Sequence, residues 1–267
     1  MIAFLLDHAA ALRLAAFAGV LAVMALWEAV APRRVQAHSR LARWPNNLGI
    51  VLVDTLAVRL LIPTSLAAFA TYAEVQGWGL FHLLPVPGFV AVAGSILLLD
   101  LAIYAQHVTF HAVPMFWRLH RMHHSDLEFD VTTGVRFHPI EILLSVLIKL
   151  VVIALLGAAP VAVLLFEILL NATAMFNHSN AKLPLWLDRV VRALLVTPDM
   201  HRIHHSVVRV ETDSNFGFNL SVWDRLFGTY RREPEAGQLG LTIGISQFRD
   251  HKELRLDRML TQPFREG

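Results

Sequence analysis

The chain has 267 residues, of which 55% are hydrophobic and 16% are charged, and its formal net charge is +2 at pH 7. The mean hydropathy of +0.52 exceeds what a soluble domain normally shows. We expect no nucleic-acid partner. Cysteine is absent, which excludes disulfides, iron–sulfur clusters held by this chain, thiolate-ligated haem and cysteine zinc sites.

Apolar residues gather in five blocks that are long enough to be membrane spans, because about 20 helical residues cross the hydrocarbon of a bilayer. These blocks are residues 9–31, 48–73, 89–105, 140–159 and 161–176. The first lacks a basic leader and is too long for a cleaved signal, so we expect it to be retained. If the second block spans, we expect its Asp54, Arg59 and Pro63 to face protein and not lipid. Gly157 and Pro160 separate the last two blocks and predict a helical hairpin.

Basic residues predict the side of the membrane on which each loop lies. Four arginines occur between residues 33 and 43, and the positive-inside rule places this segment in the cytoplasm. Residues 71–88 and 157–160 contain no Lys or Arg, in agreement with an outside location. Alternation of the spans then puts residues 106–139 and the chain after residue 177 on the cytoplasmic side, which we expect to be that of a bacterial inner membrane.

Ten of the fourteen histidines lie between residues 107 and 205 in a repeated pattern. His107 and His111 form HxxxH at the end of the third predicted span, where this spacing puts both rings on one helical face. HxxHH occurs twice, and each copy holds its rings within an arc of about 100°. The two copies comprise His120, His123, His124, His201, His204 and His205. Thr197 as N-cap and Pro198 as first residue predict a helix for the second copy.

His138 and His178 lie at ends of predicted spans on the same side as these patterns. Each is a candidate ligand or a group that orients one, and for His178 we favour the ligand role. Four ligands satisfy a zinc ion and six an octahedral iron, so the eight to ten convergent imidazoles predict two ions. Imidazole binds iron, zinc, copper and nickel, so the ligand type does not select the metal.

The identity of the ions would decide the function. Two irons with open positions at a lipid-facing pocket can reduce O₂ with two supplied electrons and oxidise an unactivated C–H bond, whereas two zinc ions would hydrolyse a lipid. A membrane metal transporter is a further alternative, but it requires polar ligands along the spans and not at one face.

The histidine patterns and their surroundings resemble the fatty acid hydroxylase and sterol desaturase superfamily of membrane di-iron oxidases. The accompanying motifs are HSD at 124–126, FHP at 137–139, NHS at 177–179, NFG at 215–217 and WDRLFGT at 223–229. The similarity covers about residues 90–232, and the three-part histidine arrangement is highly specific. It implies an all-α integral membrane helical bundle with a cytoplasmic helical cap that carries a dinuclear metal site.

By this resemblance nine histidines would be iron ligands, namely His107, His111, His120, His123, His124, His178, His201, His204 and His205. Some members have a further histidine at the position of Ala174, so either His138 replaces it or the site has one ligand fewer. The resemblance also implies two Fe ions, with zinc possible in the isolated protein, and O₂ as co-substrate. A membrane lipid would be hydroxylated or desaturated.

No haem-binding or flavin-binding segment is apparent, so we expect an external electron donor: a ferredoxin, a rubredoxin, or a cytochrome with its reductase. Arg202, Arg209 and nearby basic residues are candidates for docking such an acidic partner or, equally, for contacting lipid headgroups. We divide the chain into N-terminal transmembrane helices at 1–88, an oxidase core at 89–232 and a cytosolic tail at 233–267.

Three further features leave alternatives open. Residues 184–196 predict an amphipathic helix, either at the membrane interface or as a core helix of the cap. Asp100 is placed to orient a ligand ring or to pair with Arg59. Asp126, Glu128 and Asp130 either accept from ligand N–H groups or belong to a solvated acidic turn.

Overall fold

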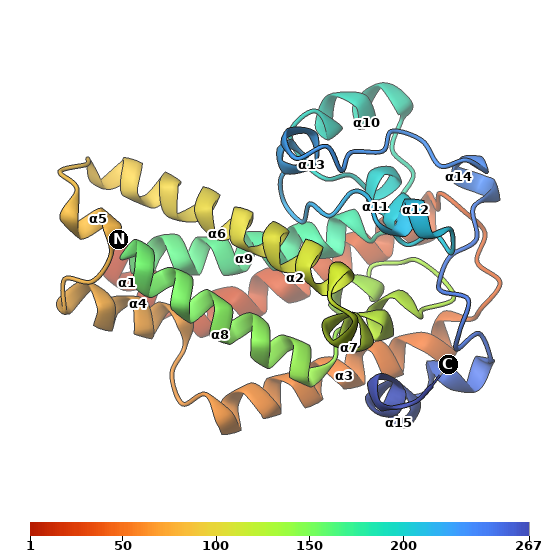
Figure 1. Cartoon of the computed structure of the whole chain (residues 1–267), viewed down its shortest axis with the longest axis horizontal. Helices are drawn as coiled ribbons and strands as arrows, with labels where there is room; N and C mark the ends of the chain where they lie inside the picture. The colour runs from red at the N-terminus through yellow and green to blue at the C-terminus, as the bar shows by residue number, and fades with distance from the viewer. Residues whose placement is uncertain (267) are drawn as a thin grey trace.

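The computed structural model describes residues 1–266, and within them the regular structure is entirely helical. Figure 1 shows an elongated bundle that meets a broader cap at one end. The α-helices are α1 Ile2–Asp7, α2 Ala9–Val30, α3 Arg40–Leu61, α4 Leu66–Val75, α5 Leu80–Leu83, α6 Gly88–Ala112, α7 Pro114–His124, α8 Pro139–Leu156, α9 Pro160–Asn177, α10 Leu185–Arg192, α11 Pro198–His204, α12 Arg209–Thr212, α13 Val222–Leu226, α14 Gly237–Gly240 and α15 Leu256–Thr261. Short 3₁₀ helices are η1 Thr133–Val135, η2 His251–Leu254 and η3 Gln262–Phe264. The predicted all-α class is confirmed.

Five helical segments are long and apolar enough to cross a membrane, and they match the five predicted blocks. They are α2, the segment Arg40–Leu83, α6, α8 and α9. Figure 1 shows that α6 runs toward the cap, α8 runs away from it and α9 returns. The segments therefore alternate in direction, and the connections 113–138 and 178–266 both lie at the cap end.

The second segment is broken into α3 and α4. α3 ends at Leu61, and the extended Ile62 precedes Pro63, which disfavours a helical residue before it. Ser65 then caps α4 by accepting from the backbone N–H of Ala68 at 3.1 Å. Asp54 is buried as expected, but Arg59 and Pro63 are exposed, so the expectation that these two residues face protein is wrong.

The turn between α8 and α9 requires glycine. Gly157 has a φ of 64°, and a Cβ at this position would lie 2.2 Å from the carbonyl oxygen of Trp78. Pro160 is the first residue of α9, where its missing N–H costs nothing. The predicted hairpin is confirmed.

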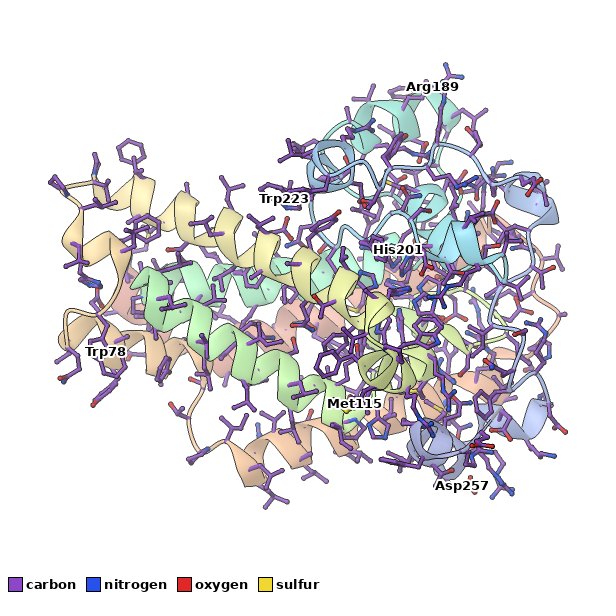
Figure 2. The ribbon with its side chains drawn as sticks, in the orientation of Figure 1. Trp78, Met115, Arg189, His201, Trp223 and Asp257 are labelled. Carbon is purple, nitrogen blue, oxygen red and sulfur yellow. The ribbon has the colours of Figure 1, made fainter. Side chains whose placement is uncertain are left out.

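Asp100 joins α6 to the cap. Its carboxylate accepts from the indole N–H of Trp223 at 2.8 Å and from the backbone N–H of Leu220 at 3.3 Å. Figure 2 shows Trp223 at the edge of the cap that overlies α6. Asp100 therefore neither pairs with Arg59 nor orients a ligand ring, and it fixes the cap on the helix that carries HxxxH.

A buried ion network fixes the segment after α7 against α3. Arg43 is fully buried and donates to Asp126 at 2.8 and 2.6 Å and to Asp130 at 2.5 Å. Burial alone would raise the pKa of Asp126, but the Arg43 guanidinium holds it well below its usual range. Both alternatives are wrong for Asp126 and Asp130, because these acids are neither solvated nor bonded to the histidine groups. Glu128 is partly exposed and accepts from the backbone N–H of Ala37 at 2.6 Å.

Helix α10 has three of its apolar side chains exposed and two of its three charged side chains buried. Leu185, Trp186 and Val190 are exposed, whereas Asp188 and Arg192 are buried and form an ion pair at 2.7 Å. A core helix of a cap would have the opposite distribution. The exposed apolar face fits the membrane-interface alternative, which stays a prediction.

Candidate metal centre

Nine histidines meet where the bundle joins the cap, and four helices position them. α6 continues through the HxxxH pair, α7 carries the first HxxHH, α9 is followed directly by His178, and α11 leads into the second HxxHH. Thr197 caps α11 by accepting from the backbone N–H of Met200 at 3.4 Å, and Pro198 is the first residue, as the sequence predicts. Figure 2 shows His201 at this junction.

The nine rings form two groups, each with its possible ligand atoms within 4.8 Å of one another. The first group contains His107, His111, His120, His124 and His204, and the second contains His123, His178, His201 and His205. All nine histidines are buried, with exposed fractions of at most 4%. The structure thus brings together nine of the ten candidate ligands.

The Nε2 atoms of each group point at one another. In the first group His107 Nε2 lies 3.1 Å from His120 Nε2 and 3.0 Å from His204 Nε2. In the second group His178 Nε2 lies 3.1 Å from His201 Nε2 and 3.2 Å from His205 Nε2. Each group therefore surrounds a small volume lined with imidazole nitrogens.

The two groups are adjacent. His123 and His124 are neighbours in α7, yet each belongs to a different group. The rings of His124 and His205 stack with their centroids 4.4 Å apart and so connect the groups. Two ions bound in these groups would be close neighbours.

Hydrogen bonds at the other ring nitrogen set the orientation of six of these histidines. Backbone carbonyls lie near four Nδ1 atoms: Phe216 at 2.7 Å from His107, Arg136 at 3.0 Å from His123, Ala174 at 2.8 Å from His178 and Ser214 at 2.7 Å from His204. Carboxylates lie near two more, Glu141 at 2.6 Å from His120 and Asp213 at 3.2 Å from His111. Only an Nδ1–H can donate to these oxygens.

This arrangement fits metal ions. A neutral imidazole that donates Nδ1–H outward has an unprotonated Nε2, whose lone pair here points into the group. Burial lowers the pKa of His120 and of His178 to about 3, so these rings do not take up protons to relieve the crowding. Several lone pairs that converge within hydrogen-bond distance repel one another unless a cation lies between them.

Sequence reasoning missed the two carboxylates. Glu141 is in the first turn of α8, and Asp213 follows α12, so neither belongs to a histidine pattern. A carboxylate behind a ligating histidine orients the ring and raises its basicity. The sequence held one weak signal, which is that Glu141 is the one acidic residue of the largely apolar block 140–159.

Phenylalanine rings enclose the second group. Phe137 stacks on His123 with centroids 4.4 Å apart, Phe129 lies 5.5 Å from His178, and Phe218 lies 6.0 Å from His201. Phe129 and Phe218 are themselves buried. These apolar walls keep bulk water from the imidazoles.

His138 lies outside both groups. Its Nδ1 accepts from the backbone N–H of Ile140 at 3.2 Å and so caps α8, and its Nε2 lies 3.1 Å from the carbonyl oxygen of Leu260. Both ring nitrogens are therefore used elsewhere, and we remove His138 from the ligand set. It does not replace a histidine at the position of Ala174, whose carbonyl instead accepts from His178.

Trp117 lies between the first histidine group and the protein surface. Trp117 is partly exposed, and its ring lies 4.8 Å from that of His111 and 5.4 Å from that of His124. The exposed Arg209 covers Trp117 at 5.1 Å. Arg202, in contrast, is fully buried and paired with Asp199, so the prediction that it docks a partner is wrong.

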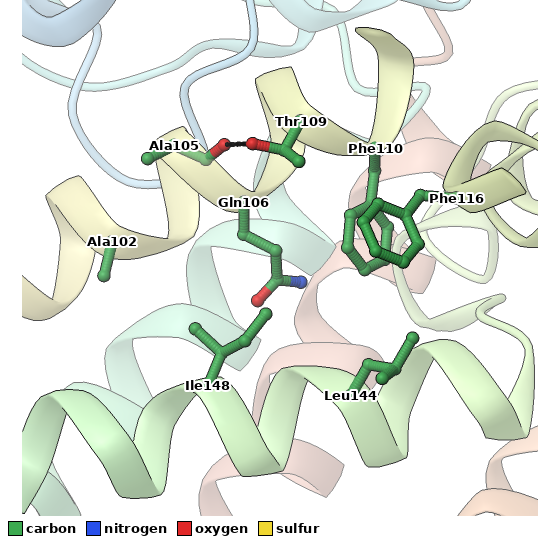
Figure 3. Close-up of a pocket in the computed structure, with 8 residues that line it drawn as sticks. All are labelled: Ala102, Ala105, Gln106, Thr109, Phe110, Phe116, Leu144 and Ile148. Atoms are coloured by element: carbon green, nitrogen blue, oxygen red, sulfur yellow. Dashed lines mark hydrogen bonds between the residues drawn. The ribbon is translucent and has the colours of Figure 1, made fainter. Parts of the chain in front are cut away.

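An apolar groove between α6, α7 and α8 lies beside the first group. Its volume is about 340 Å³, and it is lined by Ala102, Ala105, Gln106, Thr109, Phe110, Phe116, Leu144 and Ile148. Figure 3 shows Gln106 extending from α6 toward Ile148, with Phe110 and Phe116 at one end. The ring of Phe110 lies 6.2 Å from that of His120, so the groove ends next to the histidines.

Five apolar helical segments under a cap that holds two buried polyhistidine groups define the class of integral membrane proteins with histidine-box centres. The family model for fatty acid hydroxylase matches residues 92–229, which is about half of the chain and includes all nine histidines. The chain belongs to the fatty acid hydroxylase family, as the resemblance implied.

The chain is also similar in sequence to several lipid hydroxylases and monooxygenases. The chain is 29% identical over 242 residues to ornithine lipid hydroxylase OlsE of Rhizobium tropici, covering 86% of this chain and 71% of that protein. It is 31% identical over 150 residues to human alkylglycerol monooxygenase, covering 56% of this chain and 32% of that protein. It is 26% identical over 146 residues to cholesterol 25-hydroxylase of Rattus norvegicus, covering 54% and 48%.

No solved structure matches the chain. The relatives are hydroxylases and monooxygenases, and the chain is accordingly an oxygen-using oxidoreductase of the fatty acid hydroxylase type. The chain spans only about a third to a half of the two animal relatives named above, so what is specific to those whole proteins does not transfer with the family.

Proposed function

We propose that the protein is a di-iron oxidase that hydroxylates a membrane lipid with O₂ and electrons from an external donor. The observation that carries the proposal is the outward Nδ1–H donation by six buried imidazoles, which aims their Nε2 lone pairs at two adjacent centres. Hydroxylation is preferred to desaturation because the relatives are named hydroxylases and monooxygenases.

The five histidines of the first group would hold one iron and the four of the second group the other. Both sets are smaller than the six ligands of an octahedral iron, so each ion keeps a position for O₂ or solvent. Bound irons would supply the redox chemistry that side chains lack, in which O₂, two external electrons and two protons convert a C–H bond into C–OH and the second oxygen atom leaves as water.

The chain itself holds the ligands neutral, orients them and excludes water. Glu141 and Asp213 fix two rings of the first group, and backbone carbonyls fix four others. The groove beside α6 would seat a lipid chain with one end next to His120. Holding a single C–H bond near the centre in an apolar groove supplies orientation that free reactants lack.

The donor would be a ferredoxin, a rubredoxin, or a cytochrome with its reductase. We place its docking at Arg209 and Trp117, because Trp117 contacts His111 and His124 and is partly exposed. An exposed arginine there favours an acidic carrier.

We further propose a bacterial inner membrane with the cap in the cytoplasm, supported by the arginines at 33–43 and by the alternating helices. The division into transmembrane helices 1–88, oxidase core 89–232 and tail 233–267 is part of this proposal. The first two parts are not separate structural units, because α3 belongs to residues 1–88 and yet its Arg43 donates to Asp126 in the oxidase core.

A metal transporter or a dinuclear zinc lipid hydrolase would use the same ligands differently. A transporter would need ligands along a path through the bundle, whereas these nine gather at one end. A zinc hydrolase would act without O₂ or a reductant.

The test uses the full chain purified in lipid nanodiscs and loaded with ferrous iron. With a reductant and O₂, mass analysis of host lipids should find a product heavier by one oxygen atom, and the zinc-loaded protein should give none. His204→Ala should lose bound metal and product formation, while His138→Ala, whose ring lies outside both groups, should retain the bound metal. Product formation without O₂, or by His204→Ala at the wild-type rate, would contradict the proposal.

A further inference from the structure

Gln106 stands out in the apolar groove. It is partly buried on α6, one residue before His107, and this helix is long and apolar enough to cross a membrane. Its side-chain oxygen is inaccessible to solvent and has no hydrogen-bond partner among the residues that the structure describes. Figure 3 shows its amide group pointing into the space between α6 and α8. An unpaired polar group at this depth is costly, because hydrocarbon offers it no partner.

Thr109 provides a comparison within the same groove. Its hydroxyl donates to the carbonyl oxygen of Ala105 at 2.7 Å, so its polar atom is satisfied within α6. The longer side chain of Gln106 extends away from the helix and makes no such bond. Of the two polar side chains that line the groove, Gln106 is therefore the one that can form a hydrogen bond to a molecule bound there.

The groove leads from Gln106 toward the histidines. Phe110 is one helical turn further along α6 and stacks on Phe116 with centroids 5.2 Å apart. The Phe110 ring lies 6.2 Å from His120, so this aromatic pair separates the groove from the first histidine group. A chain lying in the groove would pass Gln106 before it reaches the aromatic pair.

We propose that Gln106 binds a hydrogen-bonding group within the lipid chain of the substrate, so that the substrate class is a lipid bearing an amide or a hydroxyl group close to the carbon that is oxidised. A carboxamide side chain both donates and accepts, and these two groups do the same. A plain hydrocarbon chain would leave Gln106 unpaired, and an apolar pocket with one convergent polar group is the usual form of a lipid-chain site.

Anchoring the polar group at Gln106 fixes how far the chain reaches toward His120, so the oxidised carbon lies at a set number of bonds from the polar group and not from the chain's methyl end. The inference rests on the proposed lipid oxidase, because it assigns the groove to that enzyme's substrate.

The binding test does not require oxidation. Photoreactive N-propyltetradecanamide and photoreactive octadecane, which have equal chain lengths, are added separately to the full-length protein in nanodiscs without O₂ or reductant. Crosslinked peptides from α6 and α8 are then quantified by mass spectrometry. In the wild type and in Thr109→Val we expect labelling by the amide probe to exceed labelling by the hydrocarbon by about tenfold, the effect of one hydrogen bond in a dry site.

In Gln106→Leu the preference should fall to about onefold while hydrocarbon labelling persists, which shows that the groove is intact. An unchanged preference in Gln106→Leu, or equal labelling by both probes in the wild type, would overturn the inference. The two proposals fail separately: a protein that labels as expected but never oxidises lipid loses only the proposed function, and an active oxidase whose preference ignores Gln106 loses only this inference.

Discussion

Glu141 offers the sharpest test of the proposed pair of metal ions. Its carboxylate lies 2.6 Å from His120 Nδ1, and both side chains are at most 4% exposed, so solvent does not screen the contact. A carboxylate behind a ligating histidine typically changes metal affinity by about 10- to 100-fold. Glu141→Gln keeps an oxygen acceptor but loses the charge, so we expect about tenfold weaker binding. Glu141→Leu also removes the acceptor, and we expect it to weaken metal binding by about 100-fold.

The effect should be confined to one ion, because His120 belongs to the five-histidine group and none of the four in the other group contacts Glu141. Titration of metal-free protein with Co²⁺ against a competing chelator measures both dissociation constants. Glu128→Gln is the matched control, since Glu128 pairs with His38 and lies away from the ligands. Equal weakening of both ions, or no change in Glu141→Leu, would refute the assignment of ligands to two groups.

Two further predictions concern the buried network behind α7, and both use metal-free protein. Arg43→Met removes the ion-pair partner of the buried Asp126 and Asp130, which should cost about 3–5 kcal/mol and lower the unfolding temperature by about 10 °C. Arg59→Met, an exposed change on the same helix, should shift the unfolding temperature by less than about 2 °C. Equal shifts in the two variants would refute the role of the network. Because Arg43 depresses the pKa of Asp126, that pair stabilises the protein above the carboxyl's unfolded pKa of about 3.9 and is lost as the pH falls below it. The unfolding temperature of the wild type should therefore fall below about pH 4 more steeply than that of Asp126→Asn, and parallel curves would contradict this assignment.

Local sequence patterns predicted the elements that depend on neighbours along the chain. The five apolar blocks match the five spanning segments, and Gly157 with Pro160 forms the predicted hairpin. Thr197 and Pro198 begin α11 as expected. These features follow from apolar length, helix capping and backbone conformation, which are properties of a few adjacent residues.

Contacts between distant segments were not predictable in the same way. Asp126 lies in a segment rich in acidic residues that is typical of a solvated turn, and only the packing of α3 brings Arg43 beside it. Arg202 lies in a basic, polar motif, yet the fold buries it on Asp199. Arg59 is exposed because the end of α3 diverges from the bundle before the chain turns at residues 62–65 into α4 (Figure 1).

In the histidine centre, local sequence determined some features and tertiary packing determined others. Ring spacing alone determined that HxxxH and each HxxHH present their imidazoles on one side of a helix, because helical periodicity fixes directions within a few turns. Which imidazoles share an ion was decided by tertiary packing: His123 and His124 are adjacent in sequence but enter different groups, and His138 lies outside both. The reason is that a ligand set is defined by distances between atoms on separate helices, and those distances exist only after the helices have packed.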